Sequence, residues 1–138
     1  MGVFAETDDL YRVLGGFFRL LTEEAEGQLI HRVGGPLLFV YHRPEGQLLW
    51  VPNPPPGSRP AFRVLVGSEA ATTPPLLTFE QDGDTAHRFW RGEVDLAEAL
   101  ARQQIRATGP LSRAMKLLPH LDGVYPRYVR FAGEAGLG

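Results

Sequence analysis

Few side chains in this sequence have the type and spacing needed for catalysis or for binding a metal ion. The four histidines fall on separate predicted elements and form neither an i, i+4 pair nor a motif with a neighbouring glutamate; they are His31, His42, His87 and His120. None of the three serines stands in a Gly-x-Ser-x-Gly sequence, and cysteine is absent. We therefore expect no catalytic residue, no bound metal and no cofactor.

Three carboxylates alternate along one short segment, as the ligands of a cation site could. They are Glu80, Asp82 and Asp84, and they follow a strand-like run. A simpler interpretation is the polar start of a helix, in which Asp84 accepts hydrogen bonds from the free amides of the first turn. We favour this interpretation over a cation site.

The chemistry that remains is the burial of apolar surface. Between Phe79 and Leu118, short segments carry apolar side chains at helical spacing around one strand. Any hydrophobic core has such a stripe, so most of these side chains belong to the core. They are also the candidates for contact with an apolar ligand, namely Phe89, Trp90, Leu100, Ile105, Leu111, Met115 and Leu118.

Turn and cap signals divide this half of the chain into elements. A strand is predicted from Leu76 to Phe79, then a helix that begins at Asp84 and ends at Gly92. Asp95 and Glu98 have capping-box spacing for a second helix, which precedes a strand at residues 104–108. After Gly109-Pro110 the stripe of Leu111, Ala114, Met115 and Leu118 predicts a helix that Pro119 ends.

The first half of the chain predicts two helices and three strands. One helix carries Leu10, Val13, Leu14, Phe17 and Leu21, begins at Thr7 or Asp8, and bends at its Gly15-Gly16 pair. A second helix is capped by Thr22 and terminated by the Gly34-Gly35-Pro36 sequence. Strands are expected at residues 37–42, 48–51 and 62–66, the first two as a hairpin and the third after a proline-rich loop at residues 52–60.

The order of these elements resembles the sterol carrier protein (SCP-2 sterol transfer) family, over about residues 5–118. The resemblance is carried by the Asp-rich helix start at residues 82–84, Gly92, Ala99, the strand that ends in Gly109, and the sequence Ala114-Met115-Lys116-Leu117. It implies an α+β fold with a five-stranded, mostly antiparallel sheet, covered by helices that leave an apolar cavity. It also implies non-catalytic binding and transfer of a sterol-like lipid, fatty acid, fatty acyl-CoA or phospholipid.

Length and composition support one domain over residues 1–138, with a C-terminal extension at 119–138. Apolar residues make up 43% of the chain and charged residues 22%, and the net charge of −2 does not favour a nucleic-acid partner. The longest apolar run is too short to span a bilayer, so we expect a cytoplasmic protein. Thirteen arginines against one lysine, together with twelve prolines and no cysteine, fit a thermophile protein and equally the base composition of a GC-rich genome.

Two hypotheses of function stay open. The chain either carries a hydrophobic ligand, handing it to an enzyme or by transient contact to a membrane, or serves as an accessory scaffold of a complex that acts on hydrophobic substrates. The sequence does not indicate the oligomeric state or the ligand. The aromatic residues of the extension also predict that about residues 124–131 dock on the domain, with a loose end after them.

Overall fold

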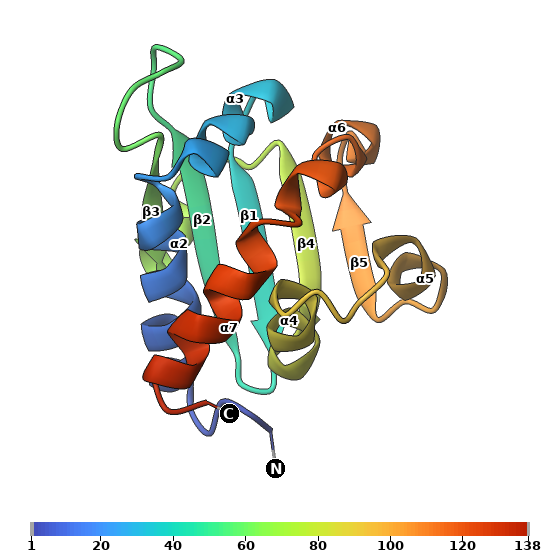
Figure 1. Ribbon diagram of the computed structural model, residues 1–138. Coiled ribbons are helices and arrows are strands. Elements are labelled where there is room, and N and C mark those ends of the chain that lie inside the picture. The colour runs from blue at the N-terminus through green and yellow to red at the C-terminus, as the bar shows by residue number, and fades with distance from the viewer. Residues whose placement is uncertain (1, 138) are drawn as a thin grey trace.

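The computed structural model describes residues 2–137, and within them a single sheet of five strands organises the fold (Figure 1). The strands are β1 (Leu37–His42), β2 (Gly46–Pro52), β3 (Phe62–Val66), β4 (Leu77–Asp82) and β5 (Ile105–Thr108). Their order across the sheet is β3-β2-β1-β4-β5. Only β1 and β4 pair in parallel, with Phe39 opposite Phe79, while the other three pairs are antiparallel. The predicted α+β fold with a mostly antiparallel sheet is confirmed.

Strand β4 is longer than the sequence suggested. The predicted strand stopped at Phe79, whereas β4 continues to Asp82 because it pairs with β1 along its whole length and with β5. The following helix, α4 (Gly83–Trp90), therefore has Asp82 as its N-cap residue, and the prediction of Asp84 at that position is wrong. Asp84 lies in the first turn, where its carboxylate accepts a hydrogen bond from the Val3 amide at 2.8 Å.

The N-cap residue of the N-terminal helix lies one position before Thr7, the first of the two predicted caps. Glu6 is the N-cap residue of α1 (Thr7–Leu10), and its amide donates to the Asp9 carboxylate at 3.2 Å. The disturbance expected at Gly15-Gly16 takes the form of a π-helical turn, η1 (Tyr11–Gly15), before α2 (Gly16–Leu21). The helix axis thus continues through the π-helical turn, and the side chains of the predicted apolar face are buried, namely Leu10, Val13, Leu14, Phe17 and Leu21.

The second helical segment is a short 3-10 helix, η2 (Ala25–Leu29), that continues into α3 (Ile30–Val33). Its N-cap residue is Glu24. Thr22, predicted as the cap, instead donates its hydroxyl to the Arg19 carbonyl at 2.6 Å because it lies in the last turn of the preceding helix. A further 3-10 helix, η3 (Gly67–Ala71), connects β3 to β4 and packs against β2.

Helix α5 (Leu96–Ala101) has the predicted cap, since the Asp95 carboxylate accepts from the Glu98 amide at 3.1 Å. The next helix, α6 (Leu111–Met115), ends earlier than predicted. Pro119 lacks the amide that would continue the helical bonding pattern, so the chain changes to the 3-10 helix η4 (Leu118–Leu121). The residues expected on one long helix are thereby divided between two short ones.

The extension folds as a helix, α7 (Val124–Glu134), that packs on the core. Val124, Tyr128 and Ala132 are fully buried on one face of α7, which confirms the predicted docking. The loose end expected after it is not seen up to Leu137, whose amide donates to the Ala132 carbonyl at 2.8 Å and caps the helix. Residue 138 lies outside the described part of the chain.

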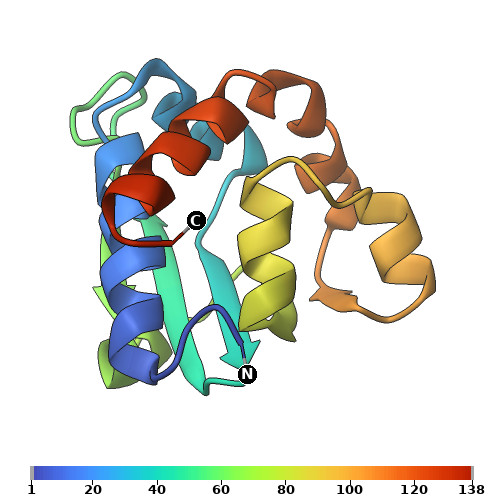
Figure 2. The ribbon, with the colours of Figure 1, turned by 60° about the horizontal axis from the view of Figure 1, so that its bottom comes forward.

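Helices α2, α4 and α7 cover the same face of the sheet, with α7 between the other two (Figures 1 and 2). Alternate side chains of the strands point to this face, as Leu37, Phe39 and Tyr41 do on β1. No helix within residues 2–137 is long and apolar enough to span a membrane.

Candidate functional site

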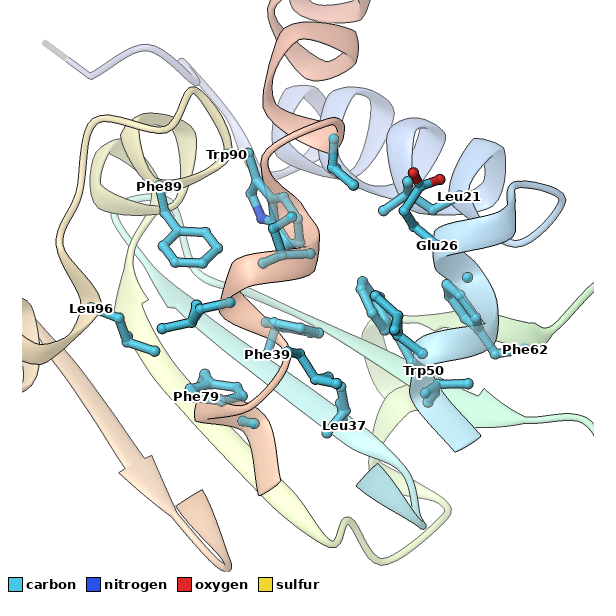
Figure 3. A pocket seen from close by; sticks show the side chains of 18 of the residues that line it. Leu21, Glu26, Leu37, Phe39, Trp50, Phe62, Phe79, Phe89, Trp90 and Leu96 are labelled. Atoms are coloured by element: carbon cyan, nitrogen blue, oxygen red, sulfur yellow. The ribbon is translucent and has the colours of Figure 1, made fainter. Parts of the chain in front are cut away.

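An apolar pocket lies between the covered face of the sheet and the helices (Figure 3). About 870 Å³ of space inside it is free of protein atoms, and part of that space opens to solvent. A large ligand would therefore have to displace side chains or extend into the part of the space that opens to solvent.

The floor of the pocket is the sheet. Leu37 and Phe39 come from β1, Trp50 from β2 and Phe79 from β4, all at positions that point toward the helices. Their rings lie close together, with centroids 5.1 Å apart for Phe39 and Trp50 and 5.8 Å apart for Phe39 and Phe79. Phe62 stacks on the other side of Trp50 with centroids 4.5 Å apart. These contacts form an aromatic surface across the strands.

The walls of the pocket come from helices that cover this face of the sheet. Helix α4 contributes Phe89 and Trp90, whose side chains are labelled in Figure 3. The remaining wall residues come from α2, η2, α3, α5, α6, η4 and the adjoining loops, and they are Leu21, Gly27, Leu29, Ile30, Leu96, Ala114, Leu117, Leu118, Leu121 and Val124. Leu121 and Val124 belong to the C-terminal extension, which therefore helps to enclose the pocket.

Four of the seven predicted contact residues line this pocket, namely Phe89, Trp90, Ile105 and Leu118. Leu100, Leu111 and Met115 are not among the lining residues. Met115 and Leu100 pack instead in a small cluster around Leu96, Ala99 and Ile105, which borders the pocket through Leu96 and Ile105, whereas Leu111 packs against the main core. Helical spacing predicted a buried side for these residues, but it did not indicate which part of that side faces the pocket.

The aromatic residues of the pocket floor were not predicted as contact residues, because the candidates were chosen mainly from segments with helical spacing. Phe39 lies on β1, whose bounds were predicted, and Trp50 lies on β2, which was predicted at residues 48–51 and extends over Gly46–Pro52. Period-two alternation would have assigned both side chains to one face of the sheet. Aromatic residues concentrated on that face were the available signal.

Charged side chains are nearly absent from the pocket wall. Among the described lining residues, Glu26 is the one charged side chain. Arg127 on α7 donates to the Glu26 carboxylate at 2.7 Å and lies 3.4 Å from that of Glu24. This hydrogen bond from Arg127 lowers the pKa of Glu26, so Glu26 remains ionised at neutral pH.

Three polar atoms of the lining side chains lack a hydrogen-bond partner. They are the indole nitrogens of Trp50 and Trp90 and the Oε1 atom of Gln81. Residues 2–137 contain only two other buried side-chain atoms in this condition, on His31 and Tyr41. Most buried polar groups in proteins are paired, so this concentration marks the pocket as distinct from the rest of the core.

A second, polar pocket lies at the carboxyl end of β4 and shares Gln81 with the apolar pocket. Its lining also includes His42, Glu80, Asp82 and Arg106. Glu80 is hydrogen-bonded to His42 and lies 3.6 Å from Arg106, and Asp82 pairs with Arg43 at 2.7 Å. The Glu80 hydrogen bond raises the pKa of His42. Each of these carboxylates has a basic partner within the protein, which supports a structural role over a cation site.

Three solved structures show the relation of this fold to known proteins. The sterol carrier protein domain 2 of Helicoverpa armigera superposes with a TM-score of 0.60 at 19% identity, covering 85% of this chain and 88% of that one. Sterol carrier protein 2 of Yarrowia lipolytica gives a TM-score of 0.58 at 9% identity, with 81% and 89% covered. No protein-family model matches the sequence, and the search of curated proteins finds no match.

A stereoselective inverting sec-alkylsulfatase from Pseudomonas sp. is similar over a part of its chain. The TM-score is 0.56 at 15% identity, and 72% of this chain is covered. The chain spans 15% of the length of that protein. At these identities the likeness concerns the fold, which is the SCP-2-like α+β fold that the sequence predicted.

Proposed function

We propose that this protein binds a hydrophobic small molecule in the pocket between its sheet and helices and transfers it without catalysis. The observation that carries the proposal is the pocket itself, whose lining is formed almost entirely by aliphatic and aromatic side chains. The removal of apolar ligand surface from water, about 25 cal/mol per Å² buried, would provide the binding energy. The SCP-2-like fold is consistent with this proposal.

Lipids and related chain-like molecules suit the pocket by the chemistry of its lining. Aromatic side chains line its floor, and most of the other lining side chains are aliphatic. Binding in the micromolar range would correspond to about 8 kcal/mol, which burial of an alkyl chain can supply. The cytoplasmic location expected from the sequence stays a prediction.

Native mass spectrometry of the purified chain tests the proposal. We expect a one-to-one complex after incubation with a neutral lipid such as monoolein, and its dissociation to the mass of the bare chain under denaturing conditions. The absence of any lipid complex, with no saturable uptake of Nile red in solution, would contradict the proposal. A complex with another protein in place of the lipid would support the scaffold hypothesis.

A further inference from the structure

The polar atoms of the pocket indicate which ligands it accepts. Trp50, Trp90 and Gln81 line the pocket. Each indole N–H lacks an acceptor and the Gln81 amide oxygen lacks a donor, and all three atoms are covered by surrounding protein atoms. Trp90 and Gln81 are 4% and 6% exposed, so water outside the protein does not readily satisfy them. Figure 3 shows the indole of Trp90 reaching from α4 into the pocket.

The charge at the pocket wall limits the charge that a bound ligand can carry. Glu26 is the single charged residue among the described lining residues, and Arg127 pairs with both Glu24 and Glu26. The group of three therefore carries one net negative charge. No basic side chain lines the described pocket to compensate a ligand carboxylate or phosphate, and an uncompensated anion in an apolar site is strongly disfavoured.

From these two conditions we infer that the pocket selects ligands whose polar group is uncharged, such as long-chain alcohols or monoacylglycerols, over fatty acids and other anionic lipids. A hydroxyl group can donate to the Gln81 amide oxygen or accept from an indole N–H, which supplies a partner that the protein lacks. A carboxylate can accept from the indoles but cannot donate to Gln81. This inference rests on the proposed function and specifies its ligand class.

Displacement of Nile red tests the inference with two ligands of equal chain length. At pH 8 we expect 1-dodecanol to displace the dye at a concentration on the order of tenfold lower than dodecanoate. Equal or tighter binding of dodecanoate would overturn the inference and leave the proposed function intact. Failure of Nile red to bind saturably would instead count against the proposed function.

Variants assign the selectivity to particular residues. Gln81→Leu removes the amide at similar size, and we expect it to weaken dodecanol binding severalfold while dodecanoate binding stays unchanged. Gln104→Leu is the matched control, because Gln104 lines the polar pocket and not the apolar one. Glu26→Gln removes the negative charge and should strengthen dodecanoate binding. If neither Gln81→Leu nor Glu26→Gln changes the ratio of the two affinities, the inference is wrong.

Thermal melts show whether each variant is folded before its affinity is compared. Trp90→Phe provides a second test of the polar contacts, since it keeps an aromatic ring in the wall and removes the N–H. We expect it to weaken dodecanol binding relative to the binding of dodecane. If dodecanol and dodecane lose affinity to the same extent, Trp90 makes only apolar contacts, and its indole N–H does not contribute to ligand selectivity.

Discussion

His87 is a buried titratable residue that joins two helices. It is 5% exposed on α4, and its Nδ1 atom lies 2.7 Å from the Tyr128 hydroxyl on α7. Burial raises the pKa of Tyr128, so the hydroxyl keeps its proton in its hydrogen bond with the imidazole. Burial, together with the Arg91 charge, lowers the pKa of His87. The fold therefore holds His87 in its neutral form.

This arrangement predicts that stability decreases in mild acid. The unfolded chain binds a proton at His87 near the ordinary pKa of 6.5, whereas the folded chain does not until a lower pH. The contribution is constant above about pH 7.5 and is lost progressively as the pH falls below about 6.5. Urea unfolding of the wild type and His87→Gln between pH 8 and pH 5 measures this effect.

We expect the free energy of unfolding of the wild type to fall more steeply with decreasing pH than that of the variant. His42 contributes with the opposite sign, because its raised pKa favours the protonated folded state. It is present in both proteins and cancels in their difference. Parallel pH profiles for the two proteins would show that His87 does not titrate differently in the folded and unfolded states.

At the scale of single residues, the sequence predicted burial better than it predicted contact with the pocket. Trp90 and Ile105 line the pocket, whereas Met115 packs with Leu96 and Ala99, although all of them are apolar residues on predicted inner faces. Periodicity determines the face on which a side chain lies. Whether space remains beside it depends on the sizes of neighbours from distant parts of the chain, which no local pattern contains.

At the scale of elements, the turn between β5 and α6 requires a glycine, because it passes close to the backbone before β4. Gly109 joins β5 to α6 with a φ angle of +112°, and a Cβ atom there would lie 2.3 Å from the Leu76 carbonyl oxygen. Both the backbone conformation and the contact exclude a side chain. The turn at Gly109 positions α6 and η4, which carry Ala114 and Leu118 in the pocket wall.

We predict that Gly109→Ala lowers the free energy of unfolding by more than about 2 kcal/mol, measured by urea denaturation. Gly57→Ala is the control, because Gly57 also has a positive φ of +96° but has no atom within 4 Å of the added Cβ position. It should cost about 1 kcal/mol from backbone strain alone. Equal losses in the two variants would mean that the contact with Leu76 is relieved by a small movement.

At the scale of elements, turn residues and apolar runs in the sequence predicted most helices and strands. The bounds of β1, β3 and β5 follow from apolar runs between glycine and proline signals. The misplaced end of β4 has a tertiary cause, because its two neighbouring strands extend it and local sequence rules do not include strand partners. The early end of α6 has a local cause, because Pro119 lacks the amide that would continue the helix.

In the whole molecule, the sheet and the helices define the pocket together. Strands β1, β2, β3 and β4 contribute the aromatic floor. The wall comes from helices that precede these strands in the sequence and from helices that follow them. Helix α7 closes the arrangement, with Tyr128 and Ala132 fully buried beneath it and Arg127 bound to Glu26. The extension is thus part of the same core, although the sequence showed no family pattern there.

The central claim is that this pocket, and no other surface, binds the hydrophobic ligand. A pair of variants with the same new side chain tests it by Nile red titration. Ala114 lines the pocket, so the ring added by Ala114→Phe would occupy ligand space, whereas Ala97 is exposed on α5 and does not line the pocket. We expect Ala114→Phe to weaken binding by on the order of tenfold or more, with Ala97→Phe close to the wild type. Binding that is unchanged in a folded Ala114→Phe variant would contradict the claim.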